Sequence, residues 1–196
     1  MASYPPNTSQ QRYYAAPIIN QHTTWPDQGW RYCTVGTLYM FLKSSGVAPH
    51  LSTTPTTDGL VGVYTDNGYG SGAHMANYIR EYTSLPDVEF LTTSSAQAFE
   101  SQLTQGLPVP IGVWHWEGAV FDHLGRQAGE STNYDVKLGE PHPRNSGWIY
   151  PDGHWGLIVG YNDDYFFIND PDSGANIRIP KATLGNSSPY RIRVSG

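Results

Sequence analysis

Apolar residues recur at helical spacing in the first half of the chain. The clearest segment predicts a helix over 33–45, with its apolar positions at Val35, Leu38, Tyr39 and Leu42. A second helix is expected over 72–83, where apolar residues again recur every three or four positions. A third is expected to open at Ser94, with Gln97 completing a capping box, and to end near Gly106.

Short apolar runs separated by turn residues replace this pattern in the second half of the chain. Strands are predicted over 109–114, 155–161, 165–169, 176–179 and 191–194. The residues Asn162, Asp163 and Asp164 predict a hairpin turn between two of them. One further β-prone segment, 17–20, precedes a stretch, 21–32, whose composition indicates a loop. Helices followed by an antiparallel sheet indicate the α+β class.

The domain organisation follows from the same pattern. Residues 1–16 are polar and contain prolines, and are expected to form an N-terminal arm. Residues 17–196 are expected to form one domain, which is long enough to bury a full core. Within it, residues 115–152 form a long excursion with several histidines and tryptophans. Because a connection of that length in a small domain is usually functional or disordered, we expect a substrate-facing flap there.

Charge and composition exclude some classes of partner. The chain carries 11 basic and 17 acidic side chains, for a formal charge of −6 at pH 7. Nucleic-acid binding needs a surplus of Lys and Arg, so no nucleic-acid partner is expected. The apolar stretches are much shorter than the roughly 20 residues that cross a bilayer, so no membrane partner is expected. No signal peptide is recognisable at the start of the sequence. The scarcity of lysine among many Ser, Thr, Asn, Gly and Tyr residues favours a secreted bacterial protein.

Three residues of different chemistry stand at element boundaries. Cys33 is the only cysteine and begins the first predicted helix, where unpaired backbone N–H groups and the helix dipole stabilise a thiolate. His154 precedes a strand, and Asp170 ends the next one. Antiparallel pairing of those two strands would bring His154 beside Asp170. Each residue alone also fits an ordinary role, as a small buried side chain, a structural histidine or a turn aspartate. Together they predict a Cys-His-Asp nucleophilic site.

The chain resembles the papain-like cysteine peptidases of the C39-like group. The resemblance spans about 17–184, and its matching segments are 18–21, Cys33 with 38–42, 106–111, and 153–161 through 169–171. It implies a papain-like α+β fold with Cys33 as nucleophile, His154 as general base and acid, and Asp170 as its orienter. It also implies a glutamine that donates to the oxyanion. Gln21 is favoured for that role, and Gln28 is the rival because it lies nearer Cys33 in the sequence. Thr34 departs from the glycine that is common in the family at that position.

The resemblance implies a thiol hydrolase that cleaves a peptide or amide bond through an acyl-enzyme on Cys33, with a peptide or protein substrate and no cofactor. A monomer is expected. The same triad would also serve acyl transfer of the transglutaminase type, and the fold without activity would serve as a peptide- or glycan-binding module. Retention of all three triad residue types argues against the binding module.

No metal site is expected. His115, Asp122, His123 and His142 do not match a zinc-binding spacing. The stretch that contains Asp170, Asp172 and Gly174 resembles the start of a calcium loop without its final glutamate, and a turn between strands explains it.

Overall fold

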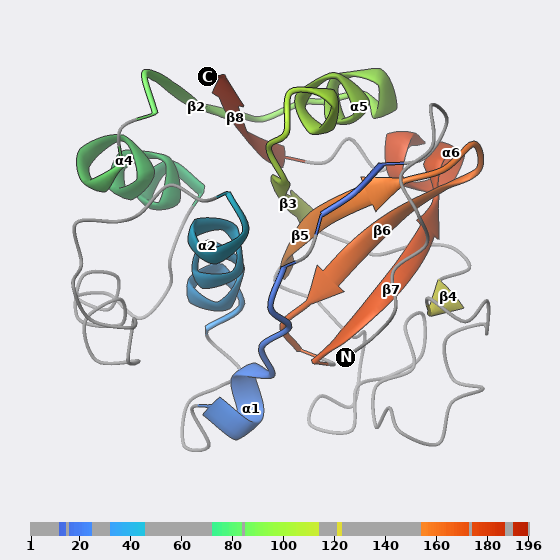
Figure 1. Cartoon of the computed structure of the whole chain (residues 1–196), viewed down its shortest axis with the longest axis horizontal. Coiled ribbons are helices and arrows are strands. Elements are labelled where there is room, and N and C mark those ends of the chain that lie inside the picture. Colours follow the sequence, from blue (N-terminus) through green and yellow to red (C-terminus); the bar gives the residue numbers. More distant parts are fainter. Residues whose placement is uncertain are drawn as a thin grey trace.

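The protein is represented by a computed structural model, which describes residues 12–14, 16–24, 32–45, 72–83, 85–113, 121–122, 154–172, 174–186 and 190–195. These residues form an antiparallel sheet in the order β2-β8-β3-β5-β6-β7-β4, with β1 also paired to β5 (Figure 1). The strands are β1 (Arg12–Tyr13), β2 (Asp87–Leu91), β3 (Val109–Val113), β4 (Phe121–Asp122), β5 (His154–Tyr161), β6 (Tyr165–Asp170), β7 (Ala175–Pro180) and β8 (Tyr190–Ser195).

Helices cover the sheet in two groups, because successive side chains of a strand point to opposite faces. The helices are α1 (Gln21–Thr24), α2 (Cys33–Ser44), α4 (Gly72–Tyr82), α5 (Ala96–Thr104) and α6 (Lys181–Asn186). Leu157 and Val159 of β5 join one core cluster with side chains of α2 and α4. Ile158, between them, joins a second cluster with side chains of α5 and α6. Figure 1 accordingly shows α2 beside α4, apart from α5 and α6.

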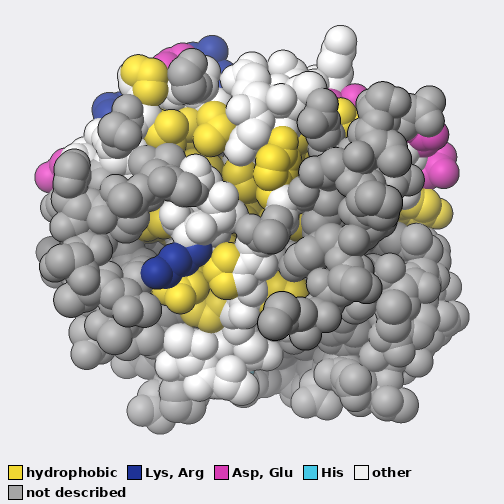
Figure 2. Space-filling model, viewed as in Figure 1, with side chains coloured by type: hydrophobic (Ala, Val, Ile, Leu, Met, Phe, Trp, Pro, Cys, Tyr) yellow, Lys and Arg dark blue, Asp and Glu magenta, His cyan; other side chains and the backbone are white. Residues whose placement is uncertain are grey.

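The described surface in this view is of mixed character. Apolar side chains gather over its middle, and acidic side chains lie near its margins (Figure 2). Ile18, at 37% exposure, is the exposed large hydrophobic residue among those that the structure describes. Most of the apolar positions that the sequence pattern placed on helix faces are buried, including Leu38, Met75 and Ile79, whereas Tyr39 is half-buried.

The α+β class with a papain-like arrangement is confirmed, and the long predicted elements match the structure closely. The predicted helices over 33–45 and 72–83 are α2 and α4, and the predicted hairpin strands are β5 and β6. The hairpin turn is confirmed as well, because the Asn162 side chain accepts hydrogen bonds from the backbone N–H groups of Asp164 and Tyr165.

The predicted cap of the third helix is wrong by one residue. This helix, α5, begins at Ala96, and the side chain of Ser95 accepts a hydrogen bond from the backbone N–H of Ala98 at 3.3 Å. Ser94 therefore precedes the cap. The physical reason is that only the residue directly before the first helical turn can reach the unpaired N–H groups of that turn.

The N-terminal segment also differs from its prediction. Residues 17–20 form no strand, whereas Arg12 and Tyr13, within the predicted arm, pair with β5. The stretch that begins at residue 21, predicted as loop, opens with the short helix α1. Asn20 explains this helix, because its side chain accepts hydrogen bonds from the backbone N–H groups of His22 and Thr23.

The predicted excursion at 115–152 lies almost entirely outside the described residues. Its described part is β4, which pairs with β7 at the edge of the sheet. The flap function and the division of the chain into an arm and one domain stay predictions.

Gly36 sets how closely α2 approaches the end of β6. A β-carbon at this position would lie 2.8 Å from Cβ of Pro171 and 3.2 Å from Cγ2 of Ile19. These distances are too short for a side chain, so α2 packs directly against the segment that follows Asp170. We expect Gly36→Val to lower the free energy of unfolding by about 1–3 kcal/mol, as overpacking in a close contact does.

Chemical denaturation would measure this loss for Gly36→Val. Lys43→Val is the matched control, since it places the same β-branched residue at an exposed position of the same helix. Because valine is a better helix former than glycine, helix propensity favours Gly36→Val, so a loss in this variant no greater than that in Lys43→Val would contradict the close-packing argument.

Candidate active site

His154 and Asp170 meet through the pairing of β5 with β6. The register places Leu157 opposite Asn169 and therefore Asp170 opposite Gly156, two residues from His154 on the same face. Nε2 of His154 lies 2.6 Å from Oδ1 of Asp170. Both side chains are buried, with residue exposures of 3% and 1%. The structure thus brings together the two residues that the sequence predicted to be neighbours.

The electrostatics of this pair favour a protonated imidazole. Burial on its own would lower the pKa of His154, because it penalises the charged form. The charge of Asp170 and its hydrogen bond act in the opposite direction, and so do a hydrogen bond and charge interaction with Cys33. Together they raise the pKa of His154 from 6.5 to about 10. The interactions with Asp170 and Cys33 therefore favour the charged form of the His154 ring.

Cys33 is the first residue of α2 and is half-buried. Backbone N–H groups at the start of a helix point out of its N-terminal end, which is where Cys33 lies. The side chain of Tyr32, at the N-cap position, makes no capping hydrogen bond. Helix α2 packs on β5, and the close contact between Gly36 and Pro171 brings its first turn to the end of the sheet where His154 and Asp170 lie. Cys33 and His154 interact there.

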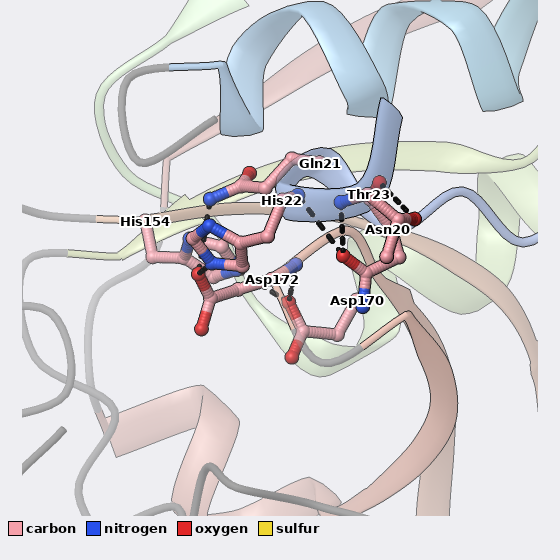
Figure 3. Close-up of polar contacts among 7 residues, drawn as sticks. All are labelled: Asn20, Gln21, His22, Thr23, His154, Asp170 and Asp172. Carbon is pink, nitrogen blue, oxygen red and sulfur yellow. Dashed lines mark hydrogen bonds and ion pairs between the residues drawn. The ribbon is translucent and has the colours of Figure 1, made fainter. Parts of the chain in front are cut away.

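Gln21 lies at the start of α1 and is almost completely buried. Its backbone N–H donates to the carbonyl of Pro171 at 2.7 Å, which attaches α1 to the segment after β6. Its side-chain Nε2 donates to Oδ1 of Asp172 at 3.0 Å. Figure 3 shows the side chains of Gln21 and His22 directed from α1 towards Asp172, with His154 and Asp170 in the same group. Gln28, the rival for the oxyanion role, lies outside the described residues, so the choice of Gln21 stays a prediction.

Other kinds of site have no support in the described part of the chain. No group of three or more His, Cys, Asp or Glu residues there is arranged to hold a metal ion. His115, His123 and His142 fall outside the residues that the structure describes. No helix among the described residues is long and apolar enough to cross a membrane.

Comparison with known proteins agrees with this arrangement. A sequence model of the Peptidase C39 like family matches residues 13–192, which is most of the chain. The chain belongs to this family. The crystal structure of a candidate C39-like peptidase from Bacillus anthracis is similar in fold, with a TM-score of 0.50 and 13% identity, over 94% of this chain and 99% of that one. No curated protein matches the chain. Membership confirms the resemblance to the C39-like group noted in the sequence.

Two polar residues of this site were not predicted as site residues from the sequence. Asp172 was assigned to a turn, and His22 to a loop. His22 Nε2 lies 2.5 Å from Oδ1 of Asp172, the same oxygen that accepts from Gln21. The only sequence signal for Asp172 as a site residue is its position two residues after Asp170. A turn between strands explains the same spacing, so the sequence alone does not indicate a role in the site.

Proposed function

We propose that this protein is a thiol hydrolase that cleaves a peptide or amide bond through an acyl-enzyme on Cys33. The observation that carries the proposal is the buried imidazole of His154, which contacts Asp170 on one side and interacts with Cys33 on the other. Family membership supports the reaction class, because the family is one of peptidases. No residue of this chain is assigned a role by that membership alone.

The proposed chemistry begins with a thiolate on Cys33 paired with the His154 imidazolium. Since Nε2 of His154 meets Asp170, Nδ1 is the ring nitrogen left for the sulfur. The thiolate attacks the carbonyl carbon of the scissile bond and forms a tetrahedral oxyanion. The Nδ1 proton passes to the departing amine as the carbon–nitrogen bond breaks and leaves a thioester on Cys33.

Water completes the cycle. Neutral His154 accepts a proton from the attacking water, a second tetrahedral intermediate forms, and its collapse releases the carboxylic acid and restores the thiolate–imidazolium pair. Asp170 keeps the ring in one orientation and favours its charged form throughout. The oxyanion would be met by backbone N–H groups at the start of α2 and by Nε2 of Gln21, which has a second hydrogen besides the one given to Asp172.

Alkylation of the folded protein by a limiting dose of iodoacetamide between pH 4 and 9 tests the thiolate–imidazolium pair. We expect rapid alkylation that persists below pH 7, because the imidazolium stabilises the thiolate. An ordinary thiol, with a pKa of about 8.5, reacts slowly in that range. Intact mass measures the extent of alkylation. Because Cys33 is the only cysteine in the sequence, any alkylated cysteine is Cys33.

His154→Ala is the matched variant for this experiment, and we expect it to lose the reactivity below pH 7. If the parent protein reacts only near pH 8.5, the hydrolase proposal fails and a binding module on the same fold becomes the better explanation. Incorporation of an added amine into product, instead of release of acid, would indicate acyl transfer.

A further inference from the structure

A second set of hydrogen bonds lies directly beside the His154–Asp170 pair. Its centre is Asp172, which is 5% exposed and follows Asp170 by two residues. Oδ1 of Asp172 is 3.0 Å from Nε2 of Gln21 and 2.5 Å from Nε2 of His22. A buried carboxylate is costly unless hydrogen bonds satisfy it, and these two donors from α1 do so.

The carboxylate determines which way the amide of Gln21 faces. An ionised carboxylate only accepts hydrogen bonds, so the NH₂ group of Gln21, and not its oxygen, must face Asp172. Oε1 of Gln21 is buried and has no hydrogen-bond partner among the described residues. Within the described part of the chain, the bond to Asp172 is therefore the side-chain hydrogen bond that fixes the orientation of this amide. One hydrogen of Nε2 is used in that bond, and the second remains for another acceptor.

Asp172 is also connected to the proposed triad. Its backbone N–H donates to Oδ1 of Asp170 at 3.0 Å. This is the same oxygen that Nε2 of His154 meets. The turn after β6 thus supports the triad carboxylate through its backbone and the glutamine of α1 through a side chain.

We infer that Asp172 is a positioning residue that orients the side-chain amide of Gln21 towards the oxyanion of the tetrahedral intermediate. The inference rests on the proposed function and deepens it. Asp172 does not touch the substrate or the reacting atoms; it acts through Gln21. Its side chain therefore affects steps that form an oxyanion, whereas reactions of the Cys33 thiolate that form none do not depend on it.

Two reagents separate these kinds of step without knowledge of the natural substrate. Acylation of Cys33 by p-nitrophenyl acetate passes through a tetrahedral oxyanion and releases one nitrophenolate per thioester formed. Alkylation by iodoacetamide is a direct displacement of iodide at carbon and forms no oxyanion. We expect Asp172→Ala to slow acylation about 10-fold, as loss of a supporting hydrogen bond does. Alkylation is expected to keep the parent rate, because the backbone N–H at position 172 still supports Asp170.

Four variants serve as controls for Asp172→Ala. Gln21→Ala is expected to slow acylation by about 100-fold, which is the effect of losing one oxyanion donor. The double variant Gln21→Ala/Asp172→Ala is expected to acylate no more slowly than Gln21→Ala, because Asp172 acts through Gln21. Thr23→Ala, at an exposed position of α1 whose side chain bonds only the carbonyl of Asn20, should leave both rates unchanged. Asp172→Asn retains an oxygen that accepts from Gln21, and it should acylate close to the parent rate. If Asp172→Ala does not fold, Asp172→Ser replaces it, since its short side chain cannot span the same distance.

The outcomes distinguish this inference from the proposed function. If the parent thiol is unreactive below pH 7, the proposed function fails and the positioning role falls with it. If the parent reacts as expected but Asp172→Ala acylates at the parent rate, the positioning role alone is overturned. Equal losses of acylation and alkylation, or additive effects in the double variant, would also overturn it, because they would show that Asp172 acts on the fold or on the Cys33–His154 pair.

Discussion

Replacing Cys33 with alanine is expected to reduce hydrolysis of peptide or amide substrates by about 10⁴-fold or more, because loss of the nucleophile removes the covalent pathway. The sequence contains a single cysteine, so no other thiol can take its place. Cys33 is half-buried and lies in the first turn of α2, so a shorter side chain there should leave the core intact. Turnover of a fluorogenic peptide mixture, compared with the parent protein, measures the loss.

The matched control for Cys33→Ala is Thr23→Ala. Thr23 lies on α1, is exposed, and makes hydrogen bonds only within the first turn of that helix among the described contacts. It should retain full activity and a nearly unchanged melting temperature. Residual turnover in Cys33→Ala equal to that of the parent protein would show that the hydrolysis comes from another group or from a contaminant, and Cys33 would then have no catalytic role.

The parts of the fold that could be predicted are those with strong local signals. Helix α4 buries one periodic apolar face, helix α2 is buried along most of its length, and β5 and β6 are apolar runs joined by a turn with asparagine and two aspartates. Strand β2 was missed because it is short and its alternation stops after three residues: Val88 is buried between exposed Asp87 and Glu89, but Phe90 and Leu91 are both half-buried. Its stability comes from pairing with β8, a contact between residues about a hundred positions apart that no local pattern reports.

The short helices were not predicted for the same reason, since they too depend on contacts that are distant in the sequence. Helix α6 and helix α1 are too brief to be stable alone, so tertiary contacts decide whether they form. In α1 those contacts are the cap from Asn20 and the attachment of Gln21 to Pro171. The segment before it contains two isoleucines, which favour a strand by propensity, and this local preference was overridden.

The candidate site shows a similar division between local and distant information. The proximity of His154 and Asp170 could be predicted because a hairpin converts sequence spacing into a register. The proximity of Cys33 to His154 could not be derived from the residues, because it depends on how α2 packs against β5 and on the contact between Gly36 and Pro171. The family resemblance supplied that link. The role inferred for Asp172 needed the structure, since its two donors lie about 150 positions away in the sequence.

Replacing Asp170 with alanine is expected to have the second-largest effect, a fall in turnover of about 10³-fold. The variant leaves the buried ring of His154 without the carboxylate that orients it and stabilises its charge. It should also lower the free energy of unfolding by about 3 kcal/mol, because removing one partner of a buried ion pair leaves the other uncompensated. Asp170→Asn keeps an oxygen that accepts from Nε2, so its activity should lie between those of the alanine variant and the parent protein.

The pH dependence of alkylation distinguishes a role of Asp170 in setting the charge of His154 from a purely structural role. The charge and hydrogen bond of Asp170 help raise the pKa of His154 to about 10 against the effect of burial. Without the charge of Asp170, the lowering effect of burial on the pKa of His154 is opposed less strongly, so this pKa falls. The His154 ring is then neutral and no longer stabilises the Cys33 thiolate. In Asp170→Asn the rise of the alkylation rate should therefore move from below pH 7 towards the pH of an ordinary thiol, about 8.5. A folded Asp170→Asn variant with the alkylation profile of the parent protein would mean that the carboxylate does not control the charge of His154, and the proposed triad would lose its third member.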